Sequence, residues 1–408
     1  RATEARRQCY GRPALSNAQS LAPSGTPRGL LLLLSVAVGA AVSNLYFAQP
    51  LAAAIATDLH AGVAEVGTTM TVTQLGYALG MILLVPLGDG RERRSVIVTT
   101  SATSIVALLL VARSSSILEL GAASFFVGVA CSVVQMIIPY AVDLVRPEER
   151  GRVVGGVMSG LLAGILLSRT ASGALGAALG WRAVYLIAAG TMTVLTVVLR
   201  IAMPAREPAE RMRWVTILRS LGTVLVSEPT LRKRALVGAF GMGCFSLFWS
   251  MLSFHLADLG YGSATAGLFG AIGVVGVFVA PVAGRLAVGP APSRLNVLGL
   301  AVAGVAFLVF ALGARSLVAI GVGVVLLDAG VQASHLTNQT VIYGMRAELR
   351  NRLNALYMVT YFAGGAAGTF AGSLAWSAGG WTAVCVVGAT LAAFGTLPLL
   401  RELRRAPA

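Results

Sequence analysis

The sequence predicts an all-α membrane protein of twelve transmembrane helices, arranged as two related bundles of six. Three observations carry this prediction. Of the 408 residues, 56% are hydrophobic and only 12% are charged, and a soluble domain could not bury so large an apolar fraction. Hydrophobic runs of about twenty residues, each long enough to cross a bilayer core, recur along nearly the whole chain. Part of the first half also recurs in the second half at a fixed spacing.

The spanning elements are predicted to be helices, because the apolar runs lack the two-residue alternation of a membrane barrel. The twelve spans are predicted, in order, at 30–50, 66–87, 95–113, 117–140, 152–174, 182–203, 235–257, 265–287, 295–313, 317–340, 353–375 and 380–400. Residues 29–203 and 235–401 then form the two six-helix bundles. Residues 1–28 and 402–408 are expected to be cytoplasmic tails, the first of them disordered because it is polar and arginine-rich.

The segment between the bundles, residues 204–234, is predicted to be a cytoplasmic linker. Its apolar residues recur at helical spacing and arginines flank them, which indicates an amphipathic helix on the membrane surface. These apolar residues are Trp214, Leu218, Leu221 and Leu225. A plain tether between the bundles and a switch both fit this pattern.

The basic residues predict the orientation. With both termini in the cytoplasm, all but four of the 31 Lys and Arg residues lie in the tails and the even-numbered loops, as the positive-inside rule requires. The four exceptions are Arg113, Arg169, Arg182 and Arg315. The net charge of +15 is thereby explained by topology and needs no nucleic-acid partner. We expect a multi-pass protein of a bacterial cytoplasmic (inner) membrane, in contact with the lipid bilayer and monomeric.

The internal repeat has a spacing of 200 residues. The matching residues are Arg146, Glu148, Arg150 and Arg152 with Arg346, Glu348, Arg350 and Arg352, Gly164 with Gly364, and Gly180-Trp181 with Gly380-Trp381. Spans four to six therefore recur as spans ten to twelve. Parallel repeats of this kind place a substrate site between the halves, near the bilayer midplane.

The loop after the second span reads Pro86-Leu87-Gly88-Asp89-Gly90-Arg91-Glu92-Arg93-Arg94. It resembles the signature loop of the major facilitator superfamily, and the resemblance extends over about residues 30 to 400. The resemblance implies secondary transport by alternating access, with Asp89, Arg93 and Arg94 acting in the cytoplasmic gate. The stretches Asn44–Pro50, Gly164–Arg169 and Asp328–Gln339 also resemble a bacterial subgroup of drug or sugar efflux permeases.

Two positions depart from the proton–drug antiporters of that superfamily. Ser124 stands where those antiporters carry an arginine four residues before a glycine, here Gly128, and Leu161 stands where a proline follows the glycine of span five. The resemblance therefore leaves the coupling ion open.

Asp328 is the main candidate for binding a proton or a cationic substrate. It lies near the middle of its predicted span, where a carboxylate costs roughly 2.5–3.5 kcal/mol and should face a cavity or a partner. Gln332, His335 and Gln339 follow at i+4, i+7 and i+11, on the same helical face. An acid that only stabilises helix packing is the alternative for Asp328, and a structural histidine is the alternative for His335.

Other polar and aromatic side chains inside the spans suit an amphipathic or aromatic substrate, or serve only to join helices. They are Asn44, Tyr46, Gln49, Tyr77, Trp249, Asn354, Tyr357 and Tyr361. Of the three on span one, at most two can line one cavity, because they do not share a narrow face. Arg169 either reaches the outer interface or lines an outer vestibule and attracts an anionic group.

The sequence predicts a transporter and no enzyme. It contains no nucleotide-binding loop, no nucleophile motif and no metal-ligand spacing, so we expect no catalytic residues, no metal and no cofactor. The predicted function is secondary active transport of small molecules, as efflux of drugs, sugars or metabolites in exchange for protons. The alternatives are a proton-symporting or uncoupled importer, and a membrane sensor on a transporter scaffold.

Overall fold

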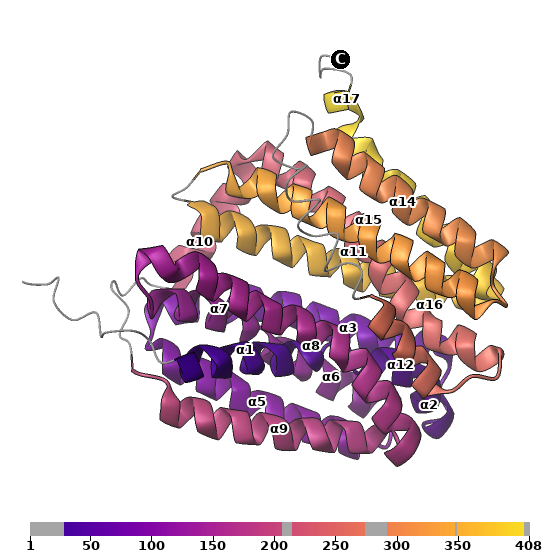
Figure 1. Ribbon diagram of the computed structural model, residues 1–408, viewed down its shortest axis with the longest axis horizontal. Helices are drawn as coiled ribbons and strands as arrows, with labels where there is room; N and C mark the ends of the chain where they lie inside the picture. The colour runs from indigo at the N-terminus through magenta and orange to yellow at the C-terminus, as the bar shows by residue number, and fades with distance from the viewer. Residues whose placement is uncertain (1–27, 206–213, 274–291, 347–348, 404–408) are drawn as a thin grey trace, which may run out of the picture.

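The described part of the chain is helical and contains no strand. This computed structural model describes residues 28–205, 214–273, 292–346 and 349–403, and within them it leaves out the side chains of residues 89, 90, 147, 351 and 401 (Figure 1). The predicted disordered tail therefore lies outside the described residues, apart from Arg28.

The helices follow the predicted spans in order. In the first half they are α1 (Arg28–Ser43), α2 (Ala48–Asp58), α3 (Val63–Leu83), α4 (Leu87–Gly90), α5 (Arg93–Arg113), α6 (Ile117–Cys131), α7 (Val134–Asp143), α8 (Arg150–Leu179) and α9 (Trp181–Ala202). After α10 (Trp214–Ser227), the second half contains α11 (Pro229–Asp258), α12 (Ser263–Ile272), α14 (Pro292–Leu312), α15 (Leu317–Tyr343), α16 (Arg350–Thr396) and α17 (Leu400–Leu403).

Twelve spans can be traced through these elements. Nine stretches of the described residues are long and apolar enough to cross a membrane, with α1 and α2 forming one span and α6 and α7 another. The last stretch makes two spans, because Gly379 and Gly380 break its helical geometry. The helices α3 and α12 complete the predicted twelve. Residues 274–291, which cover the rest of the eighth predicted span, lie outside the described residues.

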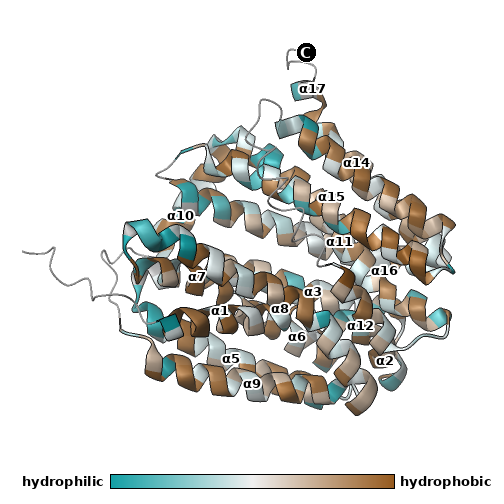
Figure 2. Cartoon of the chain, in the orientation of Figure 1, coloured by the Kyte–Doolittle hydropathy of each residue, from teal (hydrophilic) through white to brown (hydrophobic). Residues whose placement is uncertain are grey.

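The outer surface of the bundle is apolar. Large hydrophobic side chains such as Ile201, Leu312 and Val318 are 78–91% exposed, and contiguous apolar surface of this kind requires a membrane or a partner to cover it. Figure 2 shows hydrophobic residues along α9 and α14 and hydrophilic residues gathered at the helix ends near α10. This distribution fits helices that span a bilayer and end in water.

The repeat is confirmed in the backbone. Gly180 and Gly380, 200 residues apart, both have positive φ, at 84° and 59°, a region that residues with a side chain rarely adopt. In each half this glycine turns the chain directly into a helix that begins with tryptophan. His60 (φ 50°) and Gly260 (φ 85°) form a second pair at the same spacing, so the repeat also includes the ends of α2 and α11.

The two halves also pack their own helices alike. A methyl group at Gly164 of α8 would lie 2.2 Å from the carbonyl oxygen of Gly39 in α1. At Gly364 of α16 it would lie 2.3 Å from the carbonyl oxygen of Ala239 in α11. Both contacting pairs are related by 200 residues, and both backbones approach as closely as only glycine permits.

The halves meet chiefly where α3 packs on α16, α8 on α12 and α2 on α11. Ser263 donates a hydrogen bond to the carbonyl oxygen of Gly173 at 3.2 Å, and a methyl at Gly267 would lie 3.0 Å from the Gly173 Cα. The contact of Gly67 with Ser373 repeats the contact of Gly267 with Gly173 at the 200-residue spacing. We call this region, defined by these five residues, the closed face.

The ribbons of the two halves come together near α2 and α12 and separate toward α10 (Figure 1). The closed face therefore lies at the end of the bundle opposite to the start of α1 and to the linker helix.

A helix is present in the predicted linker as α10. Ile217 and Val224 are buried, whereas Trp214 and Leu225 are 37% and 38% exposed. The Trp214 indole donates a hydrogen bond to the carbonyl oxygen of Leu83 at 2.9 Å. Because a surface helix turns part of its apolar face to lipid, exposed apolar residues on α10 fit a helix at a membrane surface.

Candidate functional site

Arg169 of α8 is buried between the halves, with 3% of its surface exposed. Its Nε donates to Gln49 Oε1 at 2.6 Å and its Nη1 to the carbonyl oxygen of Ile165 at 3.3 Å. Its guanidinium carbon lies 4.6 Å from the ring centre of Tyr46, 4.4 Å from that of Trp249 and 5.3 Å from that of Phe245. Arg169 therefore does not reach the interface with water.

Three aromatic rings from two halves thus surround one cation. Tyr46 precedes α2 in the first half, while Phe245 and Trp249 belong to α11 of the second half. Rings stacked near a guanidinium stabilise its charge where water is excluded. The Nη2 atom of Arg169 is nonetheless buried without a hydrogen-bond partner.

Asp328 of α15 lies beside this group. The Trp249 indole nitrogen donates to Asp328 Oδ1 at 3.4 Å, so one tryptophan contacts the arginine with its ring and the aspartate with its nitrogen. A methyl at Gly273, the residue directly after α12, would lie 2.6 Å from Asp328 Oδ2. Arg169 is close enough to interact electrostatically with Asp328, but the two form no ion pair within 4 Å. The structure therefore brings Asp328, Arg169, Trp249, Tyr46 and Gln49 together.

The polar face predicted on α15 is present and half-buried along its length. His335 Nδ1 lies 2.9 Å from the Tyr357 hydroxyl, and its ring is 4.5 Å from that of Tyr361. Gln339 makes only a long contact to Met358, with 4.0 Å between Nε2 and Sδ. These residues extend from Asp328 toward the end of the bundle that carries α10.

Gln74 of α3 marks a second polar contact between the halves. Its Nε2 donates to Thr369 Oγ1 at 3.0 Å, and its Oε1 accepts from Ser246 at 3.3 Å. Thr369 and Ser246 stand 200 residues after Arg169 and Tyr46. The repeat thus places neutral side chains at the positions equivalent to the charged group.

Tyr77 lies one turn further along α3 and faces both halves. Its hydroxyl accepts from Gln135 at 3.1 Å, and its ring contacts Phe362 with 4.5 Å between ring centres. It joins the wall between the halves, but no contact links it to Arg169.

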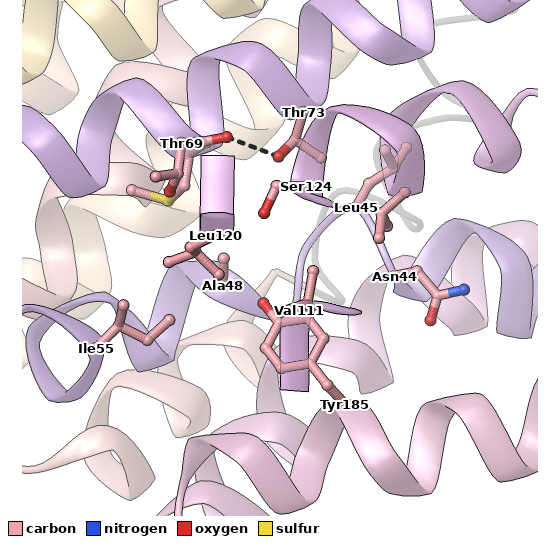
Figure 3. A pocket seen from close by; sticks show the side chains of 12 residues that line it. Asn44, Leu45, Ala48, Ile55, Thr69, Thr73, Val111, Leu120, Ser124 and Tyr185 are labelled. Atoms are coloured by element: carbon pink, nitrogen blue, oxygen red, sulfur yellow. Dashed lines mark hydrogen bonds between the residues drawn. The ribbon is translucent and has the colours of Figure 1, made fainter. Parts of the chain in front are cut away.

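Asn44 and Asn354 lie apart from the Arg169 group. Asn44 is buried in the first half beside a cavity of about 20 Å³, whose wall includes Thr73, Ser124 and Tyr185 (Figure 3). Nδ2 of Asn44 is buried without a hydrogen-bond partner. Asn354 keeps an unpartnered, buried Oδ1 on α16.

The side chain of Asp89, in the predicted gate, lies outside the described residues. Arg93 donates to the carbonyl oxygen of Gly88 at 3.2 Å and forms an ion pair with Asp143 at the end of α7. Arg94 donates to the carbonyl oxygen of Met203 at 3.2 Å. Both arginines thus join helices of the first half to one another.

Sequence reasoning missed Phe245, Thr369 and Gly273. Phe245 precedes Trp249 by one helical turn, so its position on the same face was available from the sequence. Thr369 could have been found as the counterpart of Arg169 in the 200-residue repeat. No signal in the sequence singles out Gly273.

Comparison with known proteins agrees with this architecture. A bundle of twelve apolar helices in two repeated halves, with a charged group between them, defines the class of polytopic membrane transporters. Residues 31–369 match the Major Facilitator Superfamily. The chain belongs to this family.

Two relatives are similar over nearly their whole length. The "Uncharacterized transporter YgaY" of Escherichia coli O157:H7 is 38% identical over 378 residues, which cover 92% of this chain and 96% of that protein. The "Probable transporter SCO4007" of Streptomyces coelicolor is 34% identical over 391 residues, covering 94% and 90%. Both names support membrane transport.

Solved structures share the fold. A bacterial homolog of the human lysosomal transporter Spinster, in an inward-facing and occupied conformation, superimposes with a TM-score of 0.74 at 16% identity, covering 93% of this chain and 98% of that one. A POT family transporter bound to a thioalcohol-conjugated peptide gives 0.75 at 13% identity, covering 93% and 96%.

Proposed function

We propose that this protein is a proton-coupled secondary transporter of small molecules, in which Asp328 carries the coupling proton. The observation that carries the proposal is the arrangement of Arg169, Trp249 and Asp328. Arg169 belongs to the first half, whereas Trp249 and Asp328 belong to the second. Relative motion of the halves therefore changes the surroundings of the carboxylate.

Because the surroundings of Asp328 change when the halves move, proton binding is coupled to the change of conformation. A carboxyl group whose distance from a cation differs between two conformations binds protons with different affinity in each. Proton binding then shifts the conformational equilibrium by that difference in affinity. Because Trp249 contacts Arg169 and Asp328 at once, rocking of the bundles cannot leave both contacts unchanged.

Export in exchange for protons and uptake together with protons use the same group. They differ in whether substrate and proton compete for the site or bind together. A membrane sensor would bind ligand at the same group without net flux. Measurements of substrate and proton flux distinguish export, uptake and sensing from one another.

The remaining predictions belong to the same proposal. We infer an inner-membrane protein with both termini in the cytoplasm, acting as a monomer, so the closed face would be periplasmic. Asp89 would latch the cytoplasmic gate in the opposite conformation, in which a carboxylate near a helix N-terminus is stabilised. The helix α10 would hold the halves together as a surface tether.

Inverted membrane vesicles with an acidic interior test the function. A panel of sugars, amino acids, organic acids and cationic drugs is added, and a pH-sensitive dye reports the gradient. Vesicles with the wild-type protein should change the gradient with at least one class of compound, and vesicles with folded Asp328→Asn should not. If every compound leaves wild-type and control vesicles alike, and none is transported in either direction, the protein is no transporter under these conditions and a sensor becomes the better account.

A further inference from the structure

Between the halves, the Nη2 atom of Arg169 is a buried donor without a hydrogen-bond partner. Nη2 is buried, and its neighbours Nε and Nη1 already have acceptors. Within the described residues, Arg169 belongs to no ion pair. A buried guanidinium without a full set of acceptors is costly, so the atom is available to a ligand that brings an acceptor oxygen.

The groups that interact with Asp328 come from several elements. Arg169 of α8 and Tyr361 of α16 interact with it electrostatically, Trp249 of α11 donates to it, and Gly273, directly after α12, lies close to it. On its own helix, His335 is two turns away. Arg169 is the group of opposite charge that interacts with Asp328.

We propose that the transported substrate is a small organic carboxylate with an apolar or aromatic body, and that it binds together with a proton. This proposal rests on the proposed function. One carboxylate oxygen of the substrate would accept from Arg169 Nη2. The other carboxylate oxygen would accept a hydrogen bond from protonated Asp328, since two neighbouring carboxyl groups are stable only when they share a proton.

The charge count favours a carboxylate over a cation. Without substrate, Arg169 and ionised Asp328 sum to zero. With an anion and a proton bound, Arg169, neutral Asp328 and the anion again sum to zero. Either ligand alone leaves one uncompensated charge between the halves, where few groups can solvate it. A cation bound beside ionised Asp328 would leave the positive charge of Arg169 uncompensated.

The same sum of charges explains how substrate transport is coupled to proton transport. Only the empty site and the site with both ligands are neutral, so these are the two states in which the halves can rock at low cost. The predicted consequence is uptake of one carboxylate with one proton.

The surroundings define the rest of the substrate. Tyr46, Phe245 and Trp249 surround the guanidinium, and Tyr361 and His335 continue the aromatic wall. Rings of this kind favour an apolar or aromatic body. A phosphate would require more donors than one free guanidinium nitrogen.

Calorimetric titration of the purified full-length protein in detergent tests the proposal. The probes are benzoate, phenylacetate and hexanoate, each paired with its amide, and benzylamine as the cation. Titrations in two buffers of different ionisation enthalpy give the protons taken up per ligand. Wild-type protein at pH 7.5 should bind at least one carboxylate more tightly than its amide and take up about one proton, as a shared proton requires.

Four variants assign the roles. Arg169→Gln should weaken carboxylate binding at least tenfold, the loss of a charge-assisted hydrogen bond, and Arg169→Lys should recover part of it. Asp328→Asn should bind the carboxylate without proton uptake. Arg113→Gln, the same change at an exposed end of α5, should behave as wild type. Size-exclusion profiles confirm that each variant is folded.

The outcomes separate the two proposals. If none of the three carboxylates binds wild type more tightly than its amide, the substrate class is wrong. If benzylamine binds and releases a proton, the substrate class is wrong but proton coupling stands. If a carboxylate binds without proton uptake, coupling through Asp328 is wrong.

Discussion

Opening the closed face should be possible with a single side chain. In Gly173→Val, the new Cβ would lie 2.5 Å from the carbonyl oxygen of Ser263 and 2.8 Å from the Cα of Gly267. Both neighbours are backbone atoms of the other half, so neither can move without moving α12. Overpacking of this kind costs about 1–3 kcal/mol.

Only the conformation with a closed face bears this cost, because the contact is between halves. A difference of about 1–3 kcal/mol between two states shifts their ratio by roughly 5- to 150-fold. Gly173→Val should therefore increase the population in which the halves separate at the closed face by that factor.

A cysteine at Ser373 reports the shift. Ser373 is fully buried against Gly67 on the equivalent contact, so Ser373→Cys should react with a maleimide only when the closed face opens. The four native cysteines are first replaced by alanine. Gly190→Val is the matched control, because a side chain there meets nothing within 4 Å. The reasoning is refuted if folded Gly173→Val is labelled as slowly as Gly190→Val.

Three further outcomes follow from the structure. Gly380→Ala should lower stability by about 1–3 kcal/mol, because φ is 59° and ψ −149° there; thermal unfolding in detergent measures this, and an unchanged midpoint would contradict the strained backbone. Arg182→Gln should leave labelling of the cysteine reporter unchanged, since its ion-pair partner Asp58 and its acceptor, the carbonyl oxygen of Ser114, are in the same half; faster labelling would mean that the pair depends on conformation. Burial raises the pKa of Glu402, but the hydrogen bonds from Lys233 and Ser293 and the charge of Arg234 lower it by more, so the net pKa lies below 4.5. The stability that this contact contributes is therefore complete above pH 4.5 and is lost as the pH falls through the lowered pKa. Wild type should lose stability below pH 4.5 more steeply than Glu402→Gln, as thermal unfolding at a series of pH values would measure.

The helices and the repeat could be predicted because both are properties of the sequence itself. Apolar runs determine which segments cross a bilayer, and matching residues at a spacing of 200 reveal the two halves before any contact is known. The glycine–tryptophan pairs even mark where the backbone turns, at Gly180 and Gly380.

The contacts of the charged residues could not be predicted in the same way. The sequence gives the depth of Arg169 in its span, but whether it reaches water depends on how the two halves pack. Likewise, Asn44 and Tyr46 are two residues apart, yet the turn between α1 and α2 directs Tyr46 to Arg169 and leaves Asn44 inside the first half. Trp249 was a candidate by composition, but its position between Arg169 and Asp328 required the packing of α11.

The role of Asp328 is tested most directly by comparing two fluxes of the purified protein in proteoliposomes. One is accumulation of a labelled substrate, found in the vesicle panel, against its gradient under an imposed pH difference. The other is exchange of labelled for unlabelled substrate at equal pH, which needs no net proton movement. Asp328→Asn should abolish accumulation and retain exchange, because the loaded site can still alternate but can no longer release a proton. Accumulation by Asp328→Asn at the wild-type rate would contradict the account.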